Sequence, residues 1–151
     1  SRAESGDFFG RSLAAGDFDG DGRSDLAIGV PGESVGLKKS AGAVNVFYGS
    51  RWGLSAARNQ LWHQDVHGVA GVAESGDRFG STINVGDFNG DGRMDLAIGV
   101  PLESIGAAPM AGAVNVVYGR WYGLASSGNQ MWSQDSPGIQ GVAEFGDSMG
   151  G

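Results

Sequence analysis

The chain has 151 residues, enough for one ordinary domain, and contains 29 glycines but only 4 prolines. Because hydrophobic residues make up 40% of it, the chain is too apolar for a disordered glycine-rich linker, and it lacks the glycine period of collagen. The net charge of −7 argues against nucleic acid or an anionic membrane as a partner. No apolar run approaches the roughly 18 residues of a membrane span. Without cysteines, a small secreted domain needs another staple, and a bound metal is one option.

A sequence repeat organises the chain. Asp17 recurs as Asp87 and Trp62 recurs as Trp132, both 70 positions later and without insertion or deletion. A repeat of this length marks one supersecondary unit that stacks on its neighbours. We therefore divide the chain into a first blade, residues 3–72, and a second blade, residues 73–142. Residues 143–151 are either the start of a third repeat or a segment that closes an assembly between chains.

Four strands are expected in the first unit, over residues 11–16, 25–30, 42–49 and 59–65. The second of these strands ends at Pro31, which has no N–H to give to a sheet. No stretch keeps a helical period for three turns. Four strands without crossover helices predict an all-β fold in which each unit is an antiparallel meander, as in a β-propeller blade. A sandwich of eight strands is the structural alternative, which the strict repeat disfavours.

The meander predicts which loops share an end of the sheet, because successive turns alternate between the two ends of the strands. The acidic turn after the first strand and the third turn, residues 50–58, are expected at one end. Residues 31–41 and 66–78 are expected at the other end, together with their copies, residues 101–111 and 136–148.

The acidic turn has the composition of a calcium loop. Acidic or amide side chains stand at loop positions 1, 3, 5 and 9, glycines stand at positions 4 and 6, and the arginine carbonyl at position 7 is a further oxygen ligand. Ca²⁺ takes six to eight such hard oxygen ligands. An EF-hand would need glutamate at position 12, where Ile28 and Ile98 stand. The predicted ligands are Asp17, Asp19, Asp21, Arg23 and Asp25 in the first loop, and Asp87, Asn89, Asp91, Arg93 and Asp95 in the second.

The alternative is a solvated acidic turn that binds nothing. Carboxylates packed this closely repel one another, so that without a cation the sequence works against folding. We therefore expect two Ca²⁺ ions per chain.

Three elements together resemble the FG-GAP repeat of integrin α-subunit propellers and of many secreted bacterial proteins. They are Phe9-Gly10, the calcium loop and Gly29-Val30-Pro31, and the second unit repeats them. Two departures are the valine in the middle of the third element and Met149-Gly150 where Phe-Gly is expected. The resemblance implies a secreted, extracellular propeller of about seven blades, of which this chain supplies two. It also implies that ligands bind at the end of the blades opposite calcium.

The sequence offers no catalytic constellation. Its only histidines, His63 and His67, are replaced by Ser133 and Pro137 in the second unit. We therefore expect no enzyme, but a non-catalytic module for protein recognition, adhesion or scaffolding. A lectin is the first alternative, because Trp62 and Trp132 could stack on sugars, although packing between blades is the simpler role for them. The second alternative is an accessory fragment of a larger secreted enzyme.

Two blades cannot close a ring, and each would leave one apolar face in water. We therefore expect the chain to associate with itself as a trimer or tetramer, or to continue into further blades of a longer chain. Its ligand is expected to be a protein or a glycan.

Overall fold

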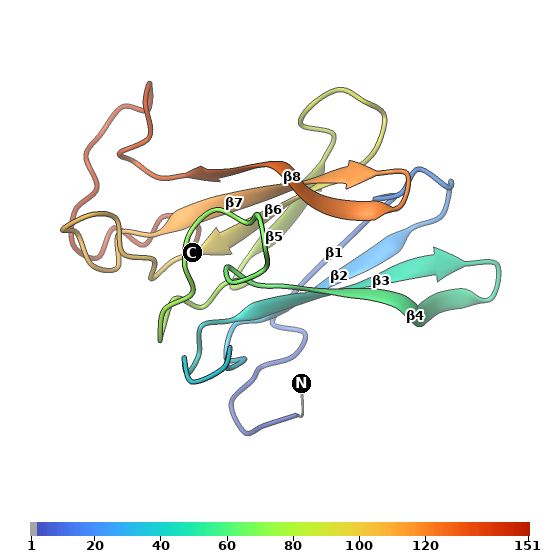
Figure 1. Ribbon diagram of the computed structural model, residues 1–151, viewed down its shortest axis with the longest axis horizontal. Coiled ribbons are helices and arrows are strands. Elements are labelled where there is room, and N and C mark those ends of the chain that lie inside the picture. The colour runs from blue at the N-terminus through green and yellow to red at the C-terminus, as the bar shows by residue number, and fades with distance from the viewer. Residues whose placement is uncertain (1–2) are drawn as a thin grey trace.

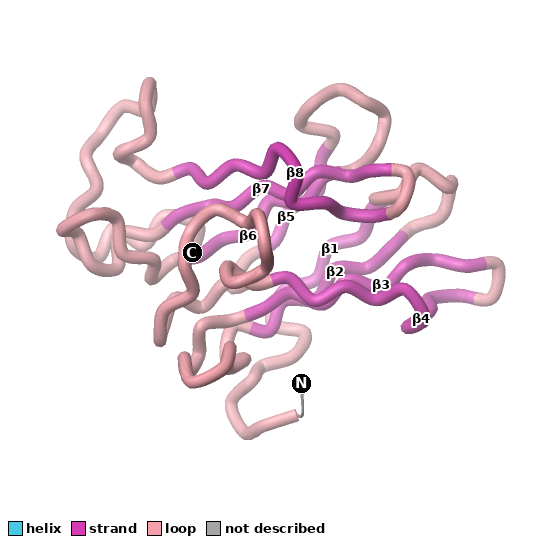
Figure 2. Tube along the Cα trace, viewed as in Figure 1, coloured by secondary structure: helices cyan, strands magenta, loops and turns pink. Residues whose placement is uncertain are grey.

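The computed structural model describes residues 3–151 and contains two four-stranded antiparallel sheets, one for each repeat. The two sheets stack on each other (Figure 1), and outside the strands residues 3–151 form loops and turns (Figure 2). Each sheet is a meander in which strand order follows the sequence. The all-β architecture of blade-like meanders is thus confirmed. The strands are β1 (Ser12–Gly16), β2 (Asp25–Val30), β3 (Ala43–Ser50), β4 (Gly53–Trp62), β5 (Ile83–Gly86), β6 (Asp95–Val100), β7 (Ala113–Arg120) and β8 (Gly123–Trp132).

The second strand of each blade is its buried centre. β2 and β6 share the sequence Asp-Leu-Ala-Ile-Gly-Val, a continuous apolar run typical of a strand covered on both faces. Both strands end directly before a proline, as the sequence predicts. No Cβ fits at Gly29, because it would lie 2.1 Å from the carbonyl oxygen of Gly80 in the next repeat. The glycine therefore allows the backbones of two blades to approach each other.

The third turn is shorter than predicted. Residues 50–58 were expected to form a long turn, but β4 already begins at Gly53 and pairs with β3 across a two-residue connection. The register shifts between Val46 and Tyr48, which places a bulge in the middle of this long hairpin. Residues 53–58 lack an apolar run, because most of them face solvent, and this hid the strand from pattern analysis.

A leading segment precedes the first strand of each repeat, and the second and third of these segments pack on the blade before them. We call residues 3–11, 73–81 and 143–151 the first, second and third leading segments. The second leading segment runs parallel to the end of blade 1 through a bridge between Gly42 and Phe79. The third makes the equivalent bridge between Gly112 and Met149. Residues 143–151 therefore lie on the blade of their own chain, as the segment before a further repeat would.

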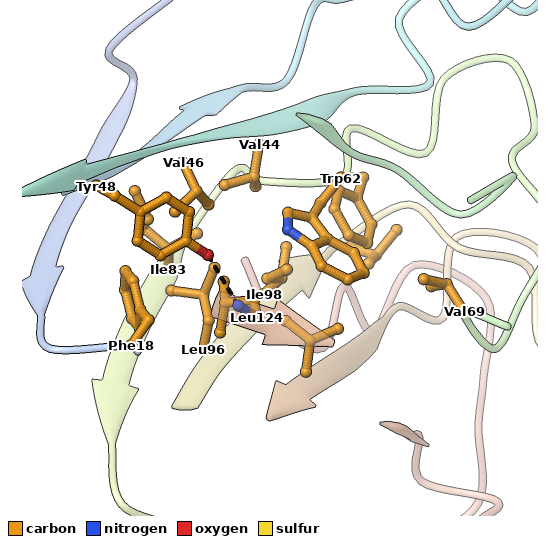
Figure 3. Close-up of a cluster of buried hydrophobic side chains, with 14 residues drawn as sticks. Phe18, Val44, Val46, Tyr48, Trp62, Val69, Ile83, Leu96, Ile98 and Leu124 are labelled. Carbon is orange, nitrogen blue, oxygen red and sulfur yellow. Dashed lines mark hydrogen bonds between the residues drawn. The ribbon is translucent and has the colours of Figure 1, made fainter. Parts of the chain in front are cut away.

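One hydrophobic core fills the space between the two sheets (Figure 3). Blade 1 contributes Phe18, Tyr48 and Trp62, and blade 2 contributes Leu96 and Leu124, all at most 5% exposed. The contact between the two blades extends from their first strands, β1 and β5, to their last strands, β4 and β8. Residues 3–151 contain no helix long and apolar enough to cross a membrane.

Candidate metal site

The turn between β1 and β2 is organised around the carboxylate of Asp17. Its Oδ1 accepts hydrogen bonds from the N–H groups of Gly20 at 2.7 Å and Asp21 at 3.0 Å, and its Oδ2 accepts one from Gly22 at 2.8 Å. Gly20 and Gly22 have φ values of 74° and 85°, in the left-handed region that favours glycine. The two glycines thus let the loop coil around its first aspartate.

The ninth residue, Asp25, anchors the loop to the sheet. Its Oδ2 accepts a hydrogen bond from the N–H of Phe18 and its Oδ1 accepts one from Gly49, both at 2.8 Å. Burial raises the pKa of this carboxyl, against the lowering effect of the two backbone donors, and the carboxylates of Asp19 and Asp17 raise it further. Asp25 therefore ties the acidic turn to the β3–β4 hairpin, and both turns lie at the same end of the blade.

Three predicted ligands of the first loop come together. Carboxylate oxygens of Asp17, Asp19 and Asp21 all lie within 4.8 Å of one another. Such a set of carboxylate oxygens on a coiled loop fits a hard cation such as Ca²⁺. Asp25 is not part of this group of three, and the Arg23 side chain turns back to form an ion pair of 2.8 Å with Asp21.

The second loop repeats this architecture, with one change of chemistry. Asp87 accepts the same three backbone hydrogen bonds, and Asp95 accepts those of Phe88 and Gly119. At the third position, Asn89 offers an amide in place of a carboxylate, and its Nδ2 donates to Asp91 at 3.2 Å. The arginine beside this loop, Arg120, lies 3.5 Å from Asp91. The second loop therefore carries less negative charge in the same geometry.

The two loops also differ in their surroundings. Asp19 is buried, whereas its counterpart Asn89 is exposed. Blade 2 covers the first loop, and the N–H of Met94 donates to the carbonyl oxygen of Asp17 at 2.9 Å. The first candidate site thus lies at the boundary between the blades, where a change in the loop also affects the packing of the blades.

Arg58 is the residue that pattern analysis missed. Its Nη2 lies 3.1 Å from Asp19 Oδ2 and donates to the carbonyl oxygen of Tyr122, while its guanidinium lies 4.8 Å from the centre of the Tyr48 ring. The only signal in the sequence is that the repeat has Gly128 at this position. Arg58 therefore pairs with the first cluster from a position at which the second repeat has no side chain.

The opposite end of the blades carries a groove of about 490 Å³. Pro31 and Pro101 contribute to its lining, together with the cationic side chains of Arg11 and Arg78. Loops from separate parts of the chain meet at this end, since Lys38 forms an ion pair of 2.8 Å with Asp65. The groove thus lies partly among the loops where the family resemblance places ligands.

The tryptophans of the last strands differ in exposure. Trp62 lies in the core between the blades, which is the packing role, whereas Trp132 is half-buried at the outer face of blade 2.

Comparison with known proteins supports the assignment of the repeats. The FG-GAP repeat model matches residues 9–47 and 79–117. The chain is 38% identical over 115 residues to phosphatidylinositol-glycan-specific phospholipase D of Rattus norvegicus, which covers 76% of this chain and 14% of the relative. It is 33% identical over 147 residues to integrin alpha-PS5 of Drosophila melanogaster and 33% identical over 146 residues to integrin alpha-4 of Xenopus laevis. Each of these matches covers 95% of this chain and 13% of the integrin.

The chain therefore spans about one seventh of the length of these relatives, and the similarity concerns the repeats alone. The family model falls on the leading Phe-Gly pair, the acidic turn and the following strands of both blades, which are the parts that carry the loop geometry. Two matches in register, together with the two meanders, show that this chain belongs to the FG-GAP repeat family.

Proposed function

We propose that the chain is a calcium-stabilised propeller module that binds other molecules and performs no catalysis itself. The acidic cluster of Asp17, Asp19 and Asp21 carries this proposal. Three carboxylates held within 4.8 Å on a preformed loop repel one another, and a divalent cation relieves the repulsion. The sequence of the second loop extends the proposal to two Ca²⁺ ions per chain.

The arrangement of the loops supports a structural role for the metal. Hydrogen bonds to Asp17 hold the backbone inside the loop, and hydrogen bonds to Asp25 hold the loop to the sheet. An ion bound in the loop would therefore strengthen the connection between the β1–β2 turn and the sheet. Few ligand carboxylates suit a weak site, of the kind found in extracellular modules at millimolar Ca²⁺. We therefore propose an extracellular location.

A binding role is supported by the polar groups at the end of the blades opposite the acidic turns. The relatives include an enzyme, a phospholipase D, but the chain covers only 14% of it. The groove among the loops opposite the acidic turns contains two arginines and no histidine. Its cationic and apolar lining suits a protein ligand that presents a carboxylate.

A carbohydrate ligand is the second candidate, supported by exposed aromatic side chains. Trp52 is 84% exposed at the tip of the β3–β4 hairpin, with the guanidinium of Arg51 4.4 Å from its ring centre. Trp121 and Tyr122 occupy the equivalent hairpin of blade 2, with their ring centres 5.1 Å apart. Such exposed rings offer flat apolar surfaces to a sugar. A glycan array with a Trp52→Ala and Trp121→Ala variant distinguishes this candidate from a protein ligand.

Thermal melting with Ca²⁺ and with excess chelator tests the metal proposal. If only the native state binds, each site adds about 2.7 kcal/mol at a Ca²⁺ concentration 100 times its Kd. The control is a double variant, Asp21→Asn with Asp91→Asn, because asparagine keeps the acceptor for the backbone N–H at each position while it removes a ligand charge. Melting curves of the unmodified chain that coincide with and without Ca²⁺ would contradict the proposal.

A further inference from the structure

The interface between the two blades joins two different faces. Blade 1 contributes a face of Phe18, Tyr48, Gln60 and Gln64, and blade 2 contributes a face of Ile83, Glu103, Asn115, Leu124 and Asn129. Each blade also has an outer face that the other blade does not cover within residues 3–151. The outer face of blade 2 corresponds to the first set, and the outer face of blade 1 corresponds to the second set. The chain therefore presents both halves of its own internal interface to solvent.

Most residues of this interface recur on the outer faces without change. The outer face of blade 2 carries Phe88, Tyr118, Gln130 and Gln134, identical to their counterparts in blade 1. The outer face of blade 1 carries Leu13, Glu33, Asn45, Leu54 and Asn59, of which only Leu13 differs in type from its counterpart, Ile83. A blade face adapted to water would carry a polar surface, as capping repeats do, and these faces instead keep the groups of the internal interface.

The apolar members of these faces are exposed on the outer surface and buried in the internal interface. Phe18 is fully buried, whereas Phe88 is 53% exposed, and Leu124 is 1% exposed, whereas Leu54 is 53% exposed. Leu13 is likewise exposed where Ile83 is buried. These large apolar side chains lie on the outer faces of both blades. Burial of both sets at once requires a partner that offers the complementary face.

On the outer face of blade 2, a tyrosine and a glutamine form the same hydrogen bond as their counterparts in the internal interface. In the internal interface, Tyr48 accepts a hydrogen bond from the N–H of Leu124 at 2.8 Å, and Gln60 donates to the carbonyl oxygen of Leu124 at 3.0 Å. On blade 2, Tyr118 donates to Gln130 at 2.7 Å, as Tyr48 does to Gln60. Tyr118 and Gln130 could therefore bind the backbone of Leu54 in a second copy, as Tyr48 and Gln60 bind the backbone of Leu124.

A second polar pair repeats this relationship. Gln64 donates to the buried carboxylate of Glu103 at 2.6 Å across the internal interface. The matching residues on the outer faces are Gln134 and Glu33, which could form the same contact between two copies of the chain. The outer faces therefore match each other in hydrogen-bonding groups as well as in apolar groups.

We propose that the outer face of blade 2 docks onto the outer face of blade 1 of a second copy of this chain, with most contacts of the internal interface. The contact of Arg58 with Tyr122 is the exception, because Gly128 stands at its position. The inference rests on the proposed propeller module and names a partner for it. The interface is heterologous, because the two faces differ, and it repeats until the ring closes. Propeller rings hold about four to eight blades, so identical two-blade chains close with an even number of blades. We expect six or eight blades, which correspond to a trimer or a tetramer.

The leading segments set one condition for this contact. Residues 143–151 occupy on blade 2 the place that residues 73–81 occupy on blade 1, since Met149 donates to Ala111 as Phe79 donates to Ala41. The first leading segment of an incoming copy would need the same place. One of the two segments must therefore move when the joint forms. In the first segment Phe9 is 61% exposed, whereas Asp7 is buried and its carbonyl oxygen accepts a hydrogen bond from Gly32 at 3.0 Å. Movement of this segment would therefore cost part of its contact with its own blade.

Native mass spectrometry of the 151-residue chain tests the inference directly. The expected mass at micromolar concentration is three or four times 15.4 kDa. Leu54→Glu on the outer face of blade 1 and Phe88→Glu on the outer face of blade 2 should each reduce the chain to a monomer. Both positions are exposed within the chain, so both variants should keep its fold, as circular dichroism can verify. Leu37→Glu is the matched control, because Leu37 is fully exposed outside these faces and should not change the mass.

Mixing the two variants tests whether the contact is head to tail. The Leu54→Glu chain retains an intact outer face of blade 2, and the Phe88→Glu chain retains an intact outer face of blade 1. An equimolar mixture should therefore form one joint and stop at a dimer of twice 15.4 kDa. A self-complementary interface predicts no such rescue.

Three results would overturn the inference: a folded monomer of the unmodified chain, an oligomer unaffected by both variants, or a mixture of variants that stays monomeric. The first of these leaves the proposed function intact if Ca²⁺ still raises the melting temperature. Conversely, a trimer or tetramer whose melting ignores Ca²⁺ supports the contact between copies and contradicts the metal proposal.

Discussion

The phenolic oxygen of Tyr48 accepts a hydrogen bond from the backbone N–H of Leu124 at 2.8 Å, across the boundary between the blades (Figure 3). The same hydroxyl donates to Gln60, and burial raises the pKa of Tyr48 to about 12. The hydroxyl therefore stays protonated at physiological pH and satisfies groups of both blades.

Tyr48→Phe should destabilise the chain because it leaves the buried N–H of Leu124 without a partner. The expected loss in the free energy of unfolding is about 1–3 kcal/mol, measured by denaturant titration. Tyr118→Phe is the matched control, since that hydroxyl faces outward, and its loss should stay below about 0.5 kcal/mol. Both measurements use the Leu54→Glu background, so that association between copies does not contribute. Equal losses at the two positions would contradict the role given to the internal interface.

Phe18→Ala should be more damaging than Phe88→Ala. Phe18 is fully buried between the blades, and large-to-small substitutions at such sites lower the free energy of unfolding by about 3–5 kcal/mol. Phe88 is half-exposed in the single chain, so its truncation in the same monomeric background should lower it by less than about 1 kcal/mol. Thermal melting of the two variants measures which substitution lowers stability more. A larger loss for Phe88→Ala than for Phe18→Ala would refute the prediction.

Glu103 makes stability depend on pH. Burial raises the pKa of its carboxyl to about 7, against the hydrogen bond from Gln64, and the carboxylates of Asp77 and Glu74 add to the rise. The folded state thus binds a proton more tightly than the unfolded state, in which the pKa lies near 4.5. This contribution to stability is fully present below pH 4.5 and is lost as the pH rises through about 7.

Glu103→Gln should remove this pH dependence, because glutamine keeps an acceptor for Gln64 and carries no charge. At pH 8 the variant should be more stable than the unmodified chain by about 1–3 kcal/mol, and at pH 4.5 the difference should vanish. Denaturant titrations across this range provide the measurement, with Glu33→Gln as the control at the equivalent half-exposed position. A constant difference at all pH values would contradict the assignment.

Arg58→Gly should strengthen the first metal site, because it removes the cation that pairs with Asp19. The substitution copies the second repeat, which has Gly128 at this position. Since the arginine is largely exposed, the expected gain in Ca²⁺ affinity is modest, roughly two- to fivefold. Isothermal titration calorimetry should show this change at one site only, and an unchanged affinity would indicate that Arg58 leaves Asp19 when the ion binds.

Sequence patterns predicted the local features of this fold well. β2 and β6 have the predicted bounds because apolar runs that end at proline leave little choice of structure. The acidic turns were visible because their glycines and aspartates act within nine residues of one another. The start of β4 was not visible, because residues 53–58 are mostly exposed and their strand depends on pairing with β3.

Contacts between distant residues were beyond pattern analysis. The partner of Arg58, Asp19, lies 39 positions away, and the partner of Gln64, Glu103, also lies 39 positions away. No local spacing links these pairs, and only the stacking of two meanders brings them together. The repeat nevertheless allows the internal interface, once seen, to be transferred to the outer faces residue by residue.

The most direct test of the calcium-stabilised module is the number of ions that the metal-free chain binds. Calorimetric titration with Ca²⁺, checked by native mass spectrometry, should give two ions per 15.4-kDa chain, with the weaker site at the loop that contains Asn89. Asp91→Asn should weaken only that second site. A chain that binds no Ca²⁺ at millimolar concentration would contradict the account.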